Sequence, residues 1–64
     1  MNKKIGQLIK ERVDAQNLNV IDFAKMISKE RSTVYNIFER DSIDTDLLKK
    51  IGQILHYDFF QDLL

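Results

Sequence analysis

Hydrophobic residues recur along this chain at the three- and four-residue spacings that are typical of amphipathic helices. The first stripe predicts a helix from about Asn2 or Lys3 to about Gln16, with charged residues on its opposite face. Its inward positions are Ile5, Leu8, Ile9 and Val13. Asparagine suits the left-handed residue that ends many helices, so we expect the helix to stop near Asn17.

A second, short helix is predicted over about residues 20–27, and three features agree on its start. Asn19 is a preferred N-cap residue, and Asp22 falls three positions later as its capping-box partner. Leu18 and Phe23 flank the cap with the spacing of a hydrophobic staple. The residues expected to face inward are Phe23, Ala24 and Ile27.

A tight turn over residues 28–30 precedes a third predicted helix, which runs from about Arg31 to about Arg40. Its inward stripe consists of Val34, Ile37 and Phe38. At about 100° per residue, the positions opposite this stripe are polar. They hold Ser32, Asn36 and Glu39, with Thr33, Tyr35 and Arg40 on either side.

A fourth helix is predicted to begin after Asp44, whose side chain is expected to cap it. Its inward positions are Leu47, Leu48, Ile51, Ile54 and Leu55, and His56 and Tyr57 close it. Asp58, with Gln61 three residues later, is expected to cap one further turn. That turn carries four apolar residues, Phe59, Phe60, Leu63 and Leu64, which either fold back on the first helix or stay exposed and join two copies of the chain.

These segments predict an all-α fold, a compact bundle of four to five short helices that forms a single domain over residues 1–64. A chain of this size needs a nearly continuous core and cannot also enclose a large substrate pocket. Lys-Lys-Ile-Gly-Gln occurs twice, at residues 3–7 and 49–53. We interpret this echo as chance similarity of two amphipathic helices, whose glycines let other segments approach closely.

Most of the residues that enzymes and metal sites require are missing. The chain has one histidine, no cysteine and no glycine-rich phosphate loop, so we expect no catalytic residue, no metal and no cofactor. His56 is interpreted as a helix-end residue, and Asp44 and Asp46 as residues of a helix start. The lack of cysteine fits a reducing cytoplasm, and no apolar run has the length of a signal peptide or a membrane span.

Residues 20–39, VIDFAKMISKERSTVYNIFE, combine two short helices, a short turn and a polar outer face on the second helix. Such an arrangement can place one helix in the major groove of DNA. The segment resembles the helix-turn-helix of the lambda-repressor-like (XRE) DNA-binding family. The matching positions are Ala24 where the helices cross, Ile27 before the turn, and Val34 and Ile37 in the recognition helix.

The resemblance extends over nearly all 64 residues, because IGQLIKERV before this segment and DTDLLKKIGQIL after it match the five-helix layout of the family. The stretch YNIFERDSIDTDLLKKIGQILHYDFF is similar to a subgroup of small single-domain regulators. Three positions depart from the pattern. Ser28 and Lys29 replace the usual glycine and apolar residue, and Glu30 replaces the serine or threonine cap. Glu30 would repel phosphates unless it points aside or pairs with Arg31.

The resemblance implies sequence-specific binding of double-stranded DNA by a homodimeric transcriptional regulator, with the helix at about 31–40 in the major groove. The residues expected to contact bases are Arg31, Ser32, Thr33 and Asn36, of which asparagine suits adenine. Those expected to contact phosphates are Asn19, Val20, Lys25, Lys29, Tyr35 and Arg40. Those expected to form the dimer interface are Phe59, Phe60, Leu63 and Leu64.

Charge is distributed unevenly, although the net charge is zero. Residues 1–40 hold eight basic and five acidic residues, a balance of +3, and residues 41–64 hold two and five, a balance of −3. The positive excess therefore lies in the half with the helix-turn-helix. Zero net charge and Glu30 also support an alternative, a protein-interaction module of antitoxin-like or adaptor type. Its contact surface would be the apolar segment from Tyr57 to Leu64.

Overall fold

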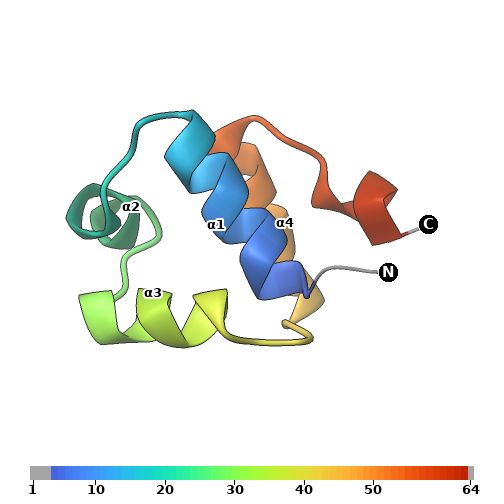
Figure 1. Cartoon of the computed structure of the whole chain (residues 1–64), viewed down its shortest axis with the longest axis horizontal. Coiled ribbons are helices and arrows are strands. Elements are labelled where there is room, and N and C mark those ends of the chain that lie inside the picture. The colour runs from blue at the N-terminus through green and yellow to red at the C-terminus, as the bar shows by residue number, and fades with distance from the viewer. Residues whose placement is uncertain (1–3, 64) are drawn as a thin grey trace.

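The computed structural model describes residues 4–63, with side chains up to residue 61, and these residues form helices only. The elements are α1 (Ile5–Ala15), α2 (Val20–Met26), α3 (Arg31–Phe38), α4 (Thr45–Leu55) and the 3-10 helix η1 (Phe59–Leu63) (Figure 1). The predicted all-α fold is therefore confirmed. None of the described helices is both long enough and apolar enough to span a membrane.

The helix boundaries differ from the predicted ones by one to three residues. Lys4 has extended backbone angles and is the N-cap of α1, so the predicted start at Asn2 or Lys3 is wrong. The second helix ends one residue early, because Ile27 is already its C-cap. The third helix ends at Phe38 rather than near Arg40. Asp44 stands at the N-cap of α4, but its side chain makes no capping hydrogen bond, so that expectation is also wrong.

The helices form a bundle of 29 × 22 × 21 Å. In Figure 1, α1 and α4 run through the middle, α2 lies to one side, α3 crosses at the foot of α1, and η1 lies on the side away from α2. The tightest helix contacts join α2 to α3, α1 to α3, and α4 to η1. Gln16 Nε2 donates to the carbonyl oxygen of Leu55 over 2.5 Å, which ties the ends of α1 and α4 together.

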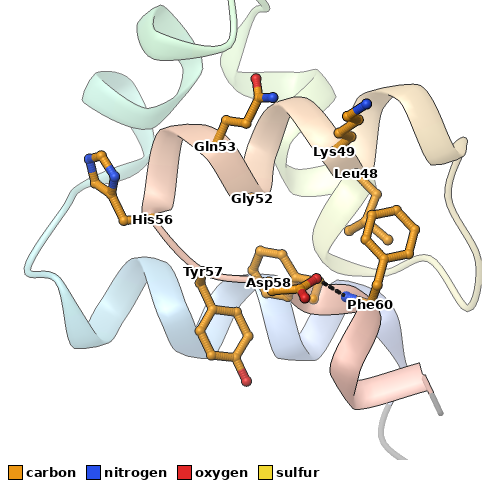
Figure 2. A pocket seen from close by; sticks show the side chains of 9 residues that line it. Leu48, Lys49, Gly52, Gln53, His56, Tyr57, Asp58 and Phe60 are labelled. Atoms are coloured by element: carbon orange, nitrogen blue, oxygen red, sulfur yellow. Dashed lines mark hydrogen bonds between the residues drawn. The ribbon is translucent and has the colours of Figure 1, made fainter.

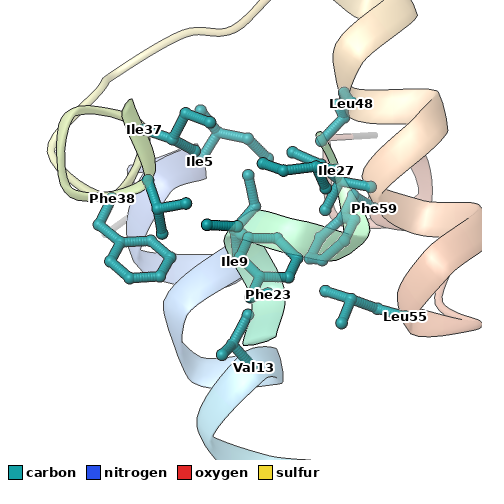
Figure 3. Packing of buried hydrophobic residues seen from close by; sticks show 13 residues of the cluster. Ile5, Ile9, Val13, Phe23, Ile27, Ile37, Phe38, Leu48, Leu55 and Phe59 are labelled. Carbon is teal, nitrogen blue, oxygen red and sulfur yellow. The ribbon is translucent and has the colours of Figure 1, made fainter. Parts of the chain in front are cut away.

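The predicted inward stripes meet in one core, to which all five elements contribute (Figure 3). Its buried members are Ile5, Ile9, Val13, Phe23, Ala24, Ile27, Val34, Ile37, Phe38, Leu48, Ile51, Leu55 and Phe59. The rings of Phe23 and Phe38 stack with their centroids 6.4 Å apart, which joins α2 to α3 at the centre. Three residues expected inside, Leu8, Leu47 and Ile54, are only partly buried at the margin of the core.

Three helices end on a non-glycine residue in the left-handed conformation: Asn17 (φ 59°), Ser28 (φ 60°) and His56 (φ 55°). The predicted left-handed helix end at Asn17 is thus confirmed. At each end the next amide bonds back to a carbonyl five residues earlier, as in the Schellman motif. Glycine is the usual residue at such positions because it has no Cβ to crowd the following carbonyl. This fold therefore stops its helices without using glycine.

The C-terminal turn folds back and closes the core. Phe59 is 1% exposed and meets the ring of Tyr57 edge-on at 4.9 Å, and the guanidinium of Arg12 lies 4.0 Å from the centre of the Tyr57 ring. Asp58 Oδ1 accepts a hydrogen bond from the Phe60 amide over 3.0 Å, so the predicted cap at Asp58 is confirmed. The turn it caps is a 3-10 helix.

Candidate nucleic-acid interface

The helix-turn-helix segment is built from α2, a turn over residues 27–30, and α3. The start of α2 follows the prediction, because Asn19 Oδ1 accepts a hydrogen bond from the Asp22 amide over 2.7 Å. The small side chain of Ala24 is buried in the core, consistent with a position where two helices pack closely. The stacking of Phe38 on Phe23 and the burial of Val34 and Ile37 hold one face of α3 toward the core, and its other face lies toward solvent.

The outer face of α3 is polar, as predicted. Ser32, Asn36 and Tyr35 are exposed, the last with 56% of its surface accessible, whereas Thr33 is half-buried. Neither Ser32 nor Asn36 uses its side chain in a hydrogen bond with any residue between 4 and 63. Two side chains that are able to donate and to accept hydrogen bonds are therefore presented outward, one helical turn apart.

Four cations between α2 and the residues just after α3 are exposed: Lys25, Lys29, Arg31 and Arg40. Within the described part of the chain none of them is engaged in a side-chain hydrogen bond or an ion pair. Lysines elsewhere do pair, since Lys4 Nζ lies 3.5 Å from Asp41 and Lys10 Nζ lies 3.2 Å from Asp14. The predicted phosphate-contact cations are thus uncommitted. Of the other predicted phosphate contacts, Val20 is half-buried and Asn19 already uses its side-chain oxygen in the cap of α2.

Carboxylates lie among these cations and weaken the positive field. Residues 19–40 hold four basic and three acidic side chains, a balance of +1. Glu30 is the N-cap of α3, yet its side chain makes no capping hydrogen bond. It also forms no ion pair with Arg31 among the described residues, so the charge of Glu30 is not neutralised beside the start of α3.

One residue that the sequence interpretation did not single out contacts the turn. Lys50 Nζ, on α4, donates to the carbonyl oxygen of Ile27 over 3.3 Å, at the C-terminal end of α2. The available signal was weak: Lys50 precedes the core residue Ile51 on α4, where a lysine ordinarily extends into solvent.

No protein-family model, curated protein or solved structure matches the chain.

A second candidate surface is the groove between α4 and η1, an open depression of about 820 Å³ (Figure 2). Leu48 and Phe59 lie buried along it, while Lys49, Gln53 and Phe60 lie exposed at its edges. The groove is mainly apolar. Among the described residues, no three histidine, aspartate or glutamate side chains come together as a metal-ion site.

The predicted dimer-interface residues Phe59 and Phe60 differ in exposure. Phe59 is buried within its own chain, so it presents no surface to a second copy, and its expected role in a dimer interface is wrong. The reason is local: the Asp58 cap turns the chain so that Phe59 points into the core, and Phe60, 38% exposed, points toward the groove. Leu63 as a side chain and Leu64 as a whole lie outside the described residues.

Proposed function

We propose that the protein binds double-stranded DNA in a sequence-specific manner and acts as a transcriptional regulator of the lambda-repressor-like class, with α3 in the major groove. The observation that carries this proposal is the uncommitted polar face of α3, with Ser32 and Asn36 exposed and unpaired within the described chain. An α-helix with its side chains is about 10–12 Å across, so α3 fits the width of about 12 Å of the major groove.

Asn36 is the principal base-reading residue in this proposal. Its amide group can donate to and accept from one adenine edge, a bidentate pair that is worth about 1–3 kcal/mol of discrimination. Ser32 lies one turn earlier on the same face. Arg31 is the first residue of α3, and in this proposal that end of the helix enters the groove first. Thr33 is half-buried, so it is expected to contribute little to base reading.

The exposed cations set the position of the protein on the DNA. Lys25 lies in α2, Lys29 lies in the turn before α3, and Arg40 follows two residues after α3. All three are exposed. Tyr35, exposed on α3, adds a hydroxyl donor. Such contacts go to phosphates, so they contribute affinity and orientation without reading the sequence.

A homodimer completes the proposed operator reader. A single 64-residue reader is expected to bind weakly, and helix-turn-helix dimers bind half-sites one helical turn, roughly 34 Å, apart. Of the two predicted interface residues whose side chains are described, Phe60 is exposed and stays in the proposed interface, whereas Phe59 is buried. The molecule measures 29 Å in its longest direction, a length of the same order as the half-site spacing.

Salt-dependent DNA binding by point variants tests the proposal. Asn36→Ala is expected to weaken binding to the preferred duplex about 5- to 150-fold and to leave the salt slope unchanged. Lys29→Ala is expected to make the negative slope of log K against log salt less steep by about 0.9, the value for one lost phosphate contact. Lys49→Ala is the matched control, because Lys49 is an exposed lysine of α4, outside the helix-turn-helix segment.

The control variant should bind as the parent does. Parent-like binding by both Asn36→Ala and Arg31→Ala would show that α3 does not read DNA with the residues assigned here.

A protein-interaction module remains the second candidate function, and the groove between α4 and η1 favours it. That groove is mainly apolar and has the exposed ring of Phe60 at its edge. An apolar partner bound there would show affinity with little salt dependence. Loss of partner binding on Phe60→Asp, with DNA binding absent from the parent, is the result expected of this alternative.

A further inference from the structure

The turn that leads from α2 into α3 is closed by a small set of backbone hydrogen bonds. The Ser28 amide donates to the Lys25 carbonyl over 3.1 Å, and the Lys29 amide donates to the Ala24 carbonyl over 2.9 Å. These two bonds satisfy two of the last carbonyls of α2, as in a Schellman motif. The Ile27 carbonyl stays open to a donor from outside the turn.

That donor comes from another helix. Lys50 Nζ on α4 lies 3.3 Å from the Ile27 carbonyl oxygen, so the ammonium stands at the C-terminal, negative end of α2. Ser28, the next residue, holds the left-handed conformation at φ 60°, which a side chain with Cβ disfavours. The turn therefore combines an unfavourable residue conformation with a contact that fixes it from outside.

We propose that Lys50 is a positioning residue for the helix-turn-helix. It does not touch DNA; it anchors the end of α2 to α4 and so fixes the direction in which the chain leaves the turn toward Arg31, four residues after Ile27. This inference rests on the proposed DNA binding by α3. In this proposal, the contact of α4 with the end of α2 determines how rigidly α3 is held in position for DNA.

The test compares Lys50→Met, which keeps the aliphatic length and removes the ammonium, with Lys50→Arg, which restores a cation. Lys49→Met on the same helix is the control, since Lys49 makes no described hydrogen bond. Amide hydrogen exchange at Lys29 reports opening of the turn, and amides in the middle of α1 report global unfolding. DNA affinity is measured across a salt series for each variant.

In Lys50→Met, exchange at Lys29 is expected to quicken about two- to fivefold relative to the α1 amides, the range of a helix-end cation. DNA affinity is expected to fall measurably, by no more than the same factor, at every salt concentration with an unchanged salt slope, and Lys50→Arg should restore both. A salt dependence that is less steep by about 0.9 in Lys50→Met would overturn the proposal, because it would make Lys50 a phosphate contact.

Unchanged exchange at Lys29 would overturn the proposal, and so would faster exchange with parent-like affinity, which would leave Lys50 a purely structural role. If the parent chain binds no DNA, the proposed function fails by itself. The exchange data then still decide whether Lys50 holds the turn.

Discussion

The backbone amide of Gly6 donates to the carbonyl oxygen of Arg40 over 3.1 Å, so the first turn of α1 sits directly against the chain leaving α3. A Cβ atom at Gly6 would overlap the backbone carbonyls of Ile37 and Phe38. Because these are backbone atoms, they can give way only if the end of α3 shifts. Gly6 thus sets the distance between the first helix and the proposed reading helix.

Gly6→Ala is therefore expected to destabilise the fold by about 1–3 kcal/mol, the range for overpacked sites. Chemical denaturation followed by circular dichroism measures the change. Gln7→Ala, one residue along the same helix on its exposed face, is the control and should stay within about 0.5 kcal/mol of the parent. Equal effects of the two substitutions would contradict the close approach of α1 and α3.

The left-handed helix ends offer stabilising substitutions. Ser28→Gly and His56→Gly are each expected to raise the free energy of unfolding by about 0.5–1 kcal/mol, since relief of the Cβ clash exceeds the entropy that glycine adds to the unfolded chain. Asn17→Gly serves as comparison, and its effect should be smaller because asparagine tolerates this conformation. Denaturation midpoints that fall in the first two variants would contradict the assigned backbone angles.

Neighbouring phenylalanines in η1 are expected to behave differently. Phe59→Ala should cost about 3–5 kcal/mol, much of the roughly 3–10 kcal/mol typical of a 64-residue domain, because the ring is buried. Phe60→Asp should change stability by about 0.5 kcal/mol or less but convert the proposed dimer to a monomer in sedimentation runs. A parent that sediments as a monomer at high concentration, unaltered by Phe60→Asp, would exclude this interface.

Glu30 provides a test that separates capping from charge. Glu30→Ser supplies the missing cap of α3 and removes a negative charge, so stability should rise by about 0.5–1 kcal/mol and DNA affinity should also rise. Glu30→Gln removes the charge with little capping benefit, so it should raise affinity alone. If neither variant binds DNA more tightly, Glu30 does not face the phosphates.

The periodic apolar positions predicted the helices and most of the core, because burial of a stripe leaves a direct trace in the spacing of residues. Asn19 was equally readable, since its cap needs only local residues. Asp44 was misassigned because local composition indicates where a helix can begin but not which way one side chain turns. The left-handed conformation of His56 was not predicted, because histidine is enriched in that conformation but most histidines adopt others.

The candidate site was likewise predicted from the sequence only in part. The outward face of α3 followed from helical geometry, whereas the contact of Lys50 with Ile27 joins residues 23 positions apart and depends on how α4 packs. Phe59 and Phe60 show the same limit, because two adjacent identical residues in an apolar turn give no hint of which one enters the core. Contacts that depend on tertiary packing can be identified only from the folded structure.

Selection of bound duplexes from a random DNA library, at low and at physiological salt, tests the central claim most directly. We expect the 64-residue chain to enrich a two-fold symmetric motif with half-sites about one helical turn apart, and Asn36→Ala to lose its most constrained base pair. A folded protein that enriches no sequence at either salt concentration would contradict DNA reading by α3.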